Sequence, residues 1–148
     1  ENYPSKQEDV LGLSLKLIAA DETIDYAIFA TSISVEEEYA LKIGDSASLR
    51  VGDQVTIIGY PNHQAGNTPF IQSCAITSKK TFLQAPLFTV SGRIIHGASG
   101  GVVLNTNCEV VGIIKGGIQT LGDDDNENQG FIPIHLALEH MQEMTKSD

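Results

Sequence analysis

Short apolar runs bounded by turn residues restrict this chain to a fold built from β-strands. The runs are rich in Val, Ile and Thr and include residues 11–18, 26–32, 54–59, 70–78, 87–90, 102–104 and 110–114. Runs of this length between turn residues are typical of sandwiches and barrels. Helical periodicity occurs only near the C-terminus, where apolar residues recur at i, i+3, i+4 and i+7 from Ile134. The sequence therefore predicts an all-β domain with a C-terminal helix.

Length and charge narrow the classes of partner. The 148 residues suffice for one compact domain with an ordinary core. The formal net charge of −10 argues against nucleic acid or an anionic membrane as the main partner. No run approaches the ~20 apolar residues of a membrane span.

The cysteines and the acidic segments give no metal motif. Cys74 and Cys108 form neither a disulfide framework nor a metal motif, and we expect Cys74 to be buried and Cys108 exposed. Residues 36–38 are interpreted as a solvated turn or linker. Residues 122–128 faintly resemble a calcium loop but lack its glycine and distal glutamate, so a polar surface loop is predicted. No cofactor and no metal are expected.

Residues 97–101, Gly-Ala-Ser-Gly-Gly, place Ser99 among small residues directly before a hairpin pattern. A serine hydroxyl becomes a nucleophile only when a base takes its proton, and acyl transfer also needs donors for the oxyanion. Glycines allow a sharp turn that aims successive N–H groups into one concavity, so Gly97 and Ser99 are the natural donors. The pentapeptide alone leaves both a turn and a nucleophile open.

Four segments in sequence order extend this pattern: "IDYAIFATSI" (24–33), "IGDSASLRVGDQVTIIGYP" (43–61), "GASGGVVLNTNCEVVGIIKGG" (97–117) and "GFIPIHLALEHM" (130–141). Together they resemble chymotrypsin-like (trypsin-fold) serine peptidases, and most closely the HtrA-type and related bacterial enzymes. The resemblance implies a double β-barrel whose second barrel is nearly complete and whose first is partial. Residues 1–42 would be strands of the first barrel, 43–54 the connection, 55–133 the second barrel, and 134–148 the closing helix and tail.

The resemblance also implies the catalytic groups. Ser99 would be the nucleophile, the Gly97 and Ser99 N–H groups the oxyanion hole, and Asp25 the acid that orients a histidine. Asp21 is an alternative acid, but only Asp25 precedes the expected strand.

The histidine itself is missing from the expected place, because none precedes the acid. The four histidines are His63, His96, His135 and His140, and the last two are expected to be solvent-exposed on the closing helix. Two interpretations stay open. The chain is a fragment of a serine endopeptidase that begins after the histidine, or it is an inactive pseudopeptidase acting as a peptide-binding or scaffolding module. Incomplete strand edges would need a partner segment or an oligomer to cover them.

The resemblance places a substrate-binding surface around the nucleophile. Lys115, Gly116 and Gly117 would pair with a protein or peptide substrate by β-addition, and Gly130 would lie on the facing wall. His96 would lie at the entrance of the specificity pocket, with Arg93 near its base. Arg93 would favour an acidic substrate residue if it points inward, although solvent exposure is the simpler expectation. The resemblance mildly favours a secreted or periplasmic location, which composition leaves open.

Overall fold

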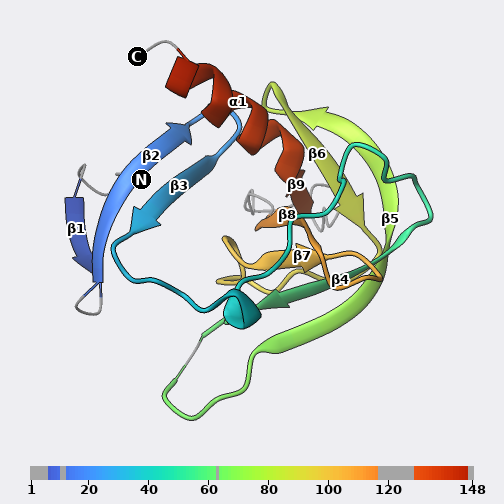
Figure 1. Ribbon diagram of the computed structural model, residues 1–148. Coiled ribbons are helices and arrows are strands. Elements are labelled where there is room, and N and C mark those ends of the chain that lie inside the picture. The colour runs from blue at the N-terminus through green and yellow to red at the C-terminus, as the bar shows by residue number, and fades with distance from the viewer. Residues whose placement is uncertain (1–6, 11–12, 63, 117–128, 147–148) are drawn as a thin grey trace.

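The computed structural model describes residues 7–10, 13–62, 64–116 and 129–146. Its elements are β1 (Gln7–Val10), β2 (Leu13–Asp21), β3 (Tyr26–Thr31), the 3₁₀ turn η1 (Glu37–Tyr39), β4 (Gln54–Gly59), β5 (Phe70–Phe82), β6 (Ala85–Val90), β7 (Val102–Leu104), β8 (Val110–Lys115), β9 (Gly130–Pro133) and α1 (Ile134–Lys146). Figure 1 shows a sheet of β1, β2 and β3 beside a barrel, with α1 running between them. No helix among the described residues is long and apolar enough to cross a membrane.

The barrel closes in the strand order β4-β5-β6-β9-β8-β7, and every neighbouring pair is antiparallel. Its strands alternate between buried and more exposed residues, as in β4, where Val55 and Ile57 point into the core. Phe131 of β9 is fully buried. A Cβ on Gly112 of β8 would lie 2.2 Å from the Phe131 ring, so this ring fills the space that the glycine leaves open.

The three-stranded sheet carries the hairpin that ends in Asp25. The turn between β2 and β3 is closed by a hydrogen bond from Asp25 N–H to the Asp21 carbonyl at 2.8 Å. Asp25 has a φ of 68°, a left-handed conformation that Asp adopts more readily than most residues. A small core that includes Ala19, Tyr26 and Ala137 joins the hairpin to α1. The position of Asp25 therefore depends on how the sheet packs against the rest of the molecule.

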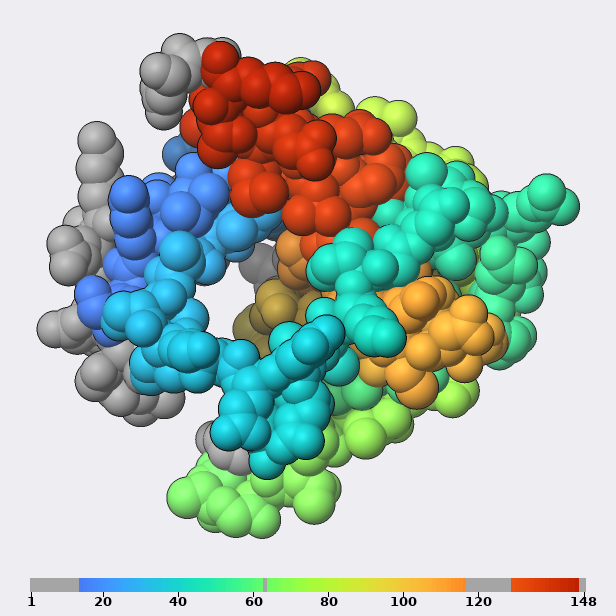
Figure 2. Space-filling model, in the orientation of Figure 1, coloured from blue at the N-terminus to red at the C-terminus, as the bar shows by residue number. Residues whose placement is uncertain are grey.

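The linker, residues 32–53 between β3 of the sheet and β4 of the barrel, exposes apolar side chains. Its exposed large hydrophobic residues include Ile33, Val35, Tyr39, Leu41 and Ile43. In Figure 2 the linker and the sheet enclose an opening beside the barrel. The linker is anchored to the barrel near Val110, whose N–H bonds to the Lys42 carbonyl at 2.7 Å and whose carbonyl accepts from Gly44 N–H at 2.8 Å.

The predicted architecture of strands with a C-terminal helix is confirmed, although some details differ. Each apolar run contributes to a strand, and β5 continues to Phe82, beyond the predicted residue 78. Strand β1 was not expected from the pattern. Cys74 is buried, Cys108 is exposed, and both are free thiols, as predicted. Residues 122–128 lie outside the described residues.

The expectation that both helix histidines are solvent-exposed is wrong. The Nδ1 of His135 lies 2.7 Å from Oγ of Ser46, which is fully buried, and the same Oγ accepts the His135 N–H at 3.0 Å. The Nδ1 of His140 is hydrogen-bonded to the hydroxyl of buried Tyr26. Buried hydroxyl groups need hydrogen-bond partners, and the two imidazoles of α1 are the partners of the Ser46 and Tyr26 hydroxyls.

Candidate active site

Ser99 lies in an exposed turn directly before β7, where the end of β8 holds the loop. Its Oγ accepts a hydrogen bond from the Gly116 N–H at 3.1 Å. The Gly100 N–H bonds to the Ile114 carbonyl, and the Ile114 N–H bonds to the Gly101 carbonyl, both at 2.8 Å. Ser99 is therefore an exposed hydroxyl on a well-anchored backbone.

Two N–H groups of the loop, those of Gly97 and Ser99, differ from their neighbours in their backbone hydrogen bonding. The Ala98 N–H bonds to the Ile95 carbonyl, and the Ala98 carbonyl accepts from the Gly101 N–H, both at 3.0 Å. In a trans peptide the N–H points opposite to the carbonyl, so the Ser99 N–H is directed away from Gly101. Within the described ranges, the Gly97 and Ser99 N–H groups make no backbone hydrogen bond.

The conformation of the loop depends on its glycines, including Gly100 with a φ of 83°. Gly97 has a φ of 91°, a region that residues with a side chain rarely adopt. A Cβ on Gly101 would lie 2.4 Å from the carbonyl oxygen of Ile58 at the end of β4. The absence of a side chain therefore allows β4 to pack directly behind Ser99.

Asp25 reaches the same region from the other sheet. Its Oδ2 lies 3.4 Å from Nζ of Lys115, the last residue of β8. The next residue, Gly116, donates to Ser99 Oγ. Two contacts thus lead from Asp25 toward Ser99: Asp25 pairs with the side chain of Lys115, and the neighbouring Gly116 bonds to Ser99.

Asp21, the alternative acid, has a different environment. Its Oδ1 accepts the Ile24 N–H at 2.7 Å, and its Oδ2 lies 3.9 Å from Nε2 of His140. The Tyr26 and His140 rings meet edge to face, with centroids 5.8 Å apart. Burial raises the pKa of Tyr26, and the Asp21 carboxylate raises it further. Asp21, Tyr26 and His140 form a polar cluster that fastens the hairpin to α1.

Among the described residues, no histidine is hydrogen-bonded or ion-paired to Ser99 or Asp25. His135 and His140 are engaged elsewhere, and His96 is exposed on the Ser99 loop. His63 lies outside the described residues. In the part of the chain that the structure describes, no imidazole therefore lies between Ser99 and Asp25.

A cavity of about 530 Å³ is formed by β5 and the segment before Ser99. It is lined by Phe70, Gln72, Arg93, Ile94, Ile95, His96 and Gln129. Arg93 and His96 therefore line one cavity, and Arg93 is also exposed to solvent. Gln129 was not predicted; its Oε1 accepts the Ile94 N–H at 2.9 Å and so holds the cavity wall. A lone glutamine outside any motif offers no sequence signal.

The remaining residues predicted to bind substrate lie in or beside strands β8 and β9 of the barrel. Lys115 pairs with Gly130 across β8 and β9, and Gly130 also pairs with Thr89 of β6. A Cβ on Gly130 would lie 2.1 Å from the Phe88 carbonyl oxygen, so only glycine fits. Gly117 lies outside the described residues.

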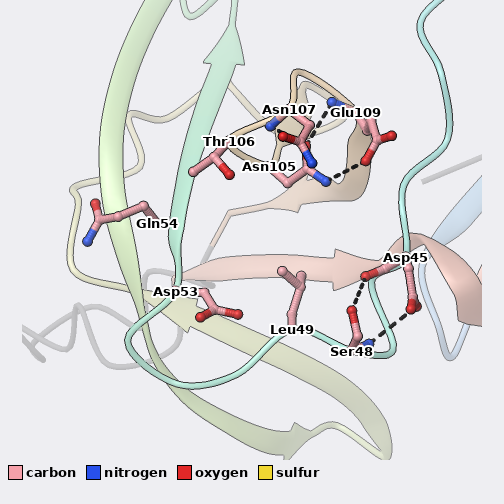
Figure 3. Close-up of a pocket in the computed structure, with 9 residues that line it drawn as sticks. All are labelled: Asp45, Ser48, Leu49, Asp53, Gln54, Asn105, Thr106, Asn107 and Glu109. Atoms are coloured by element: carbon pink, nitrogen blue, oxygen red, sulfur yellow. Dashed lines mark hydrogen bonds between the residues drawn. The ribbon is translucent and has the colours of Figure 1, made fainter.

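A second cavity, of about 400 Å³, lies at the opposite ends of β4 and β7 from Ser99 (Figure 3). It is lined by Asp45, Ser48, Leu49, Asp53, Gln54, Asn105, Thr106, Asn107 and Glu109. Its carboxylates already accept hydrogen bonds: Asp45 from backbone N–H groups, Asp53 from the Arg50 N–H, and Glu109 from the Asn105 amide. They stabilise local turns, and no acidic, histidine or cysteine group among the described residues is arranged to hold a metal.

Comparison with known proteins shows which family the chain is similar to. A family model described as a trypsin-like peptidase domain matches residues 5–113. The chain is 32% identical over 133 residues to a probable periplasmic serine endoprotease DegP-like of Hahella chejuensis, covering 89% of this chain and 28% of that protein. It is 30% identical over 133 residues to the serine protease PepD of Mycobacterium tuberculosis, covering 82% of this chain and 28% of that protein. The chain thus spans little more than a quarter of these relatives.

Solved structures of the HtrA-type protease AlgW share the fold. The structure with a decapeptide matches at a TM-score of 0.70 and 24% identity, covering 90% of this chain and 41% of that chain. The structure with a tripeptide matches at a TM-score of 0.67 and 26% identity, covering 87% and 42%.

Proposed function

Because the chain belongs to the trypsin-like peptidase domain family, we propose that it carries the serine and the acid of a serine endopeptidase active site. Ser99 attacks the scissile carbonyl and forms an acyl-enzyme, which water then hydrolyses. The Gly97 and Ser99 N–H groups bind the oxyanion, and Asp25 orients the histidine that acts as base. One observation carries this proposal: the contacts from Asp25 through Lys115 and Gly116 to Ser99 join two separate sheets.

The histidine would come from sequence preceding the chain in a longer protein. The relatives are much longer than the chain, and none of the described histidines contacts Ser99 or Asp25. The opening between the sheet, the linker and the barrel offers space for such a segment (Figure 2). The exposed apolar residues of the linker, Ile33 and Val35 among them, would pack against it or against a second copy.

The substrate class is a protein or peptide. A peptide would add as a strand along Lys115, Gly116 and Gly117, which begin at the last residue of β8. The AlgW structures contain a decapeptide and a tripeptide, in keeping with a peptide partner. The cavity lined by Arg93 and His96 would select the substrate side chain, and Arg93 would favour Asp or Glu.

Labelling with a fluorophosphonate tests the proposal directly, because this probe reacts only with an activated serine. We expect labelling in a longer form that includes the upstream sequence, and loss of labelling in Ser99→Ala. The 148-residue chain alone should label very slowly, since losing the serine–histidine unit costs about 10⁶ in kcat. Rapid labelling of the short chain that disappears in His63→Ala or His96→Ala would instead assign the base to a histidine within it.

One observation favours a second function, an inactive peptide-binding or scaffolding module. The described residues place no imidazole between Asp25 and Ser99. A longer form that fails to label with the fluorophosphonate, yet binds unfolded polypeptide at residues 115–117, would support this function and overturn the catalytic one.

A further inference from the structure

We propose that Lys115 is the counter-ion of the acid Asp25 and thereby extends the working range of the peptidase to lower pH. This inference rests on the proposed function, because it concerns the base that Asp25 holds. The ion pair between the two side chains, 3.4 Å apart, is the observation that leads to it.

The position of Lys115 on β8 explains why its side chain faces Asp25. Side chains two residues apart on a strand share a face, and Ile113 packs into the small core with Tyr26 and Ile24. Lys115 continues this face toward the β2–β3 hairpin, and its side chain is only 13% exposed. Surrounding side chains therefore hold its ammonium group in place.

Asp25 keeps room for another partner. Its side chain is 54% exposed, and only its Oδ2 is paired with Lys115. Within the described ranges, Oδ1 has no hydrogen bond. One carboxylate can therefore hold the lysine on one oxygen and receive an imidazole N–H on the other.

Lys115 weakens the stabilisation that the Asp25 carboxylate gives to the protonated imidazole. A carboxylate alone stabilises the imidazolium and raises the pKa of the histidine. A fixed ammonium group on the same carboxylate opposes this effect and repels the imidazolium, so the histidine keeps its neutral, basic form at lower pH. The ammonium group disfavours the charged form of a nearby imidazole, and because the Asp25 side chain is 54% exposed we take the change in the pKa of the histidine as about one unit.

Other titratable groups surround the hairpin, but the same groups are present in wild type and in every Lys115 variant. They are Asp21 and Glu22 on the hairpin, Tyr26 on β3, and His140 and Glu143 on α1. Asp21, Tyr26 and His140 are engaged with one another in the polar cluster. A difference between Lys115 variants therefore reports on Lys115 alone.

The test is the pH dependence of fluorophosphonate labelling of Ser99 in the longer form. Lys115→Met keeps the apolar stem and removes the charge, whereas Lys115→Arg keeps the charge. Lys79→Met is a matched control, because Lys79 lies on β5 over the ring of Phe88. We expect the pH at half-maximal labelling rate to rise by about one unit in Lys115→Met and to stay unchanged in Lys115→Arg and Lys79→Met.

The outcomes separate the inference from the proposed function. Labelling with the same midpoint in wild type and Lys115→Met would overturn the inference alone. An equal shift in Lys115→Met and Lys115→Arg would overturn it too, since packing and not charge would then be the cause. Absence of labelling in the wild-type longer form at every pH would overturn the proposed function and this inference with it.

Discussion

Replacing Gly116 by alanine should move the nucleophile without unfolding the protein. A Cβ on Gly116 would lie 2.7 Å from Ser99 Oγ, closer than real contacts allow, and that hydroxyl is the one neighbour within 4 Å among the described residues. The backbone of Gly116 is not in the left-handed region, so alanine brings no backbone strain. The clash can be relieved only by displacing Ser99 Oγ.

The structural cost of that displacement is small and the chemical cost is large. Ser99 is exposed, so its hydroxyl can rotate to another staggered rotamer and bond to water. The lost Gly116 N–H to Oγ bond contributes at most about 1 kcal/mol to stability. A reacting atom misplaced by ~1 Å costs about 10²-fold in rate. We expect Gly116→Ala to melt close to wild type and to label with the fluorophosphonate about 10²-fold more slowly.

Gly101→Ala is the matched control on the same loop. Its Cβ would lie 2.4 Å from the Ile58 carbonyl oxygen, which belongs to a barrel strand and cannot rotate away. Such overpacking costs about 1–3 kcal/mol, so this variant should lose stability in urea unfolding. Labelling of Gly116→Ala at the wild-type rate would refute the close approach of Ser99 Oγ to Gly116, and so would a stability loss equal to that of Gly101→Ala.

Three further outcomes follow from other parts of the chain. Tyr26→Phe should lower the unfolding free energy by about 1 kcal/mol at neutral pH, because the hydrogen bond to His140 is lost. Since the pKa of Tyr26 is raised from 10.0, wild type should lose stability as pH rises above that value, and urea titrations should show a weaker loss in Tyr26→Phe. Cys108 should react with a thiol reagent within the folded protein, whereas Cys74, whose pKa burial raises, should react only on unfolding; equal rates would contradict this. Peptide-library profiling of the longer form should show cleavage after Asp or Glu that is lost in Arg93→Gln, and cleavage mainly after aliphatic residues would remove Arg93 from the pocket.

The strands were predictable because their signal is local. Alternation of buried and exposed residues can be recognised within a few positions, as in β4, where Val55 and Ile57 fill the core. The glycines around Ser99 were likewise visible, because a tight turn needs them at fixed spacing. Strand β1 was missed because its polar sequence, Gln-Glu-Asp-Val, lacks the apolar alternation.

The polar contacts between distant segments were not predictable from local pattern. His140 looked solvent-exposed because nothing near it in sequence reveals that α1 packs against Tyr26. The pairing of Lys115 with Asp25 depends on how the sheet meets the barrel, which no local signal specifies. Motifs predicted roles for Ser99 and Asp25, whereas tertiary packing decides which residues surround them.

The division of Asp25 and Ser99 between two sheets makes this site an interface within one chain. The barrel has its own large core, while the hairpin is joined to it through the small core around Ala19, Tyr26 and Ala137. Local opening of so small a contact requires less free energy than global unfolding. On warming, Asp25 can therefore separate from Ser99 while the barrel is still intact. Under the proposed function, loss of catalytic competence and thermal melting would then be two separate transitions, and docking of the hairpin would be a reversible control on Ser99.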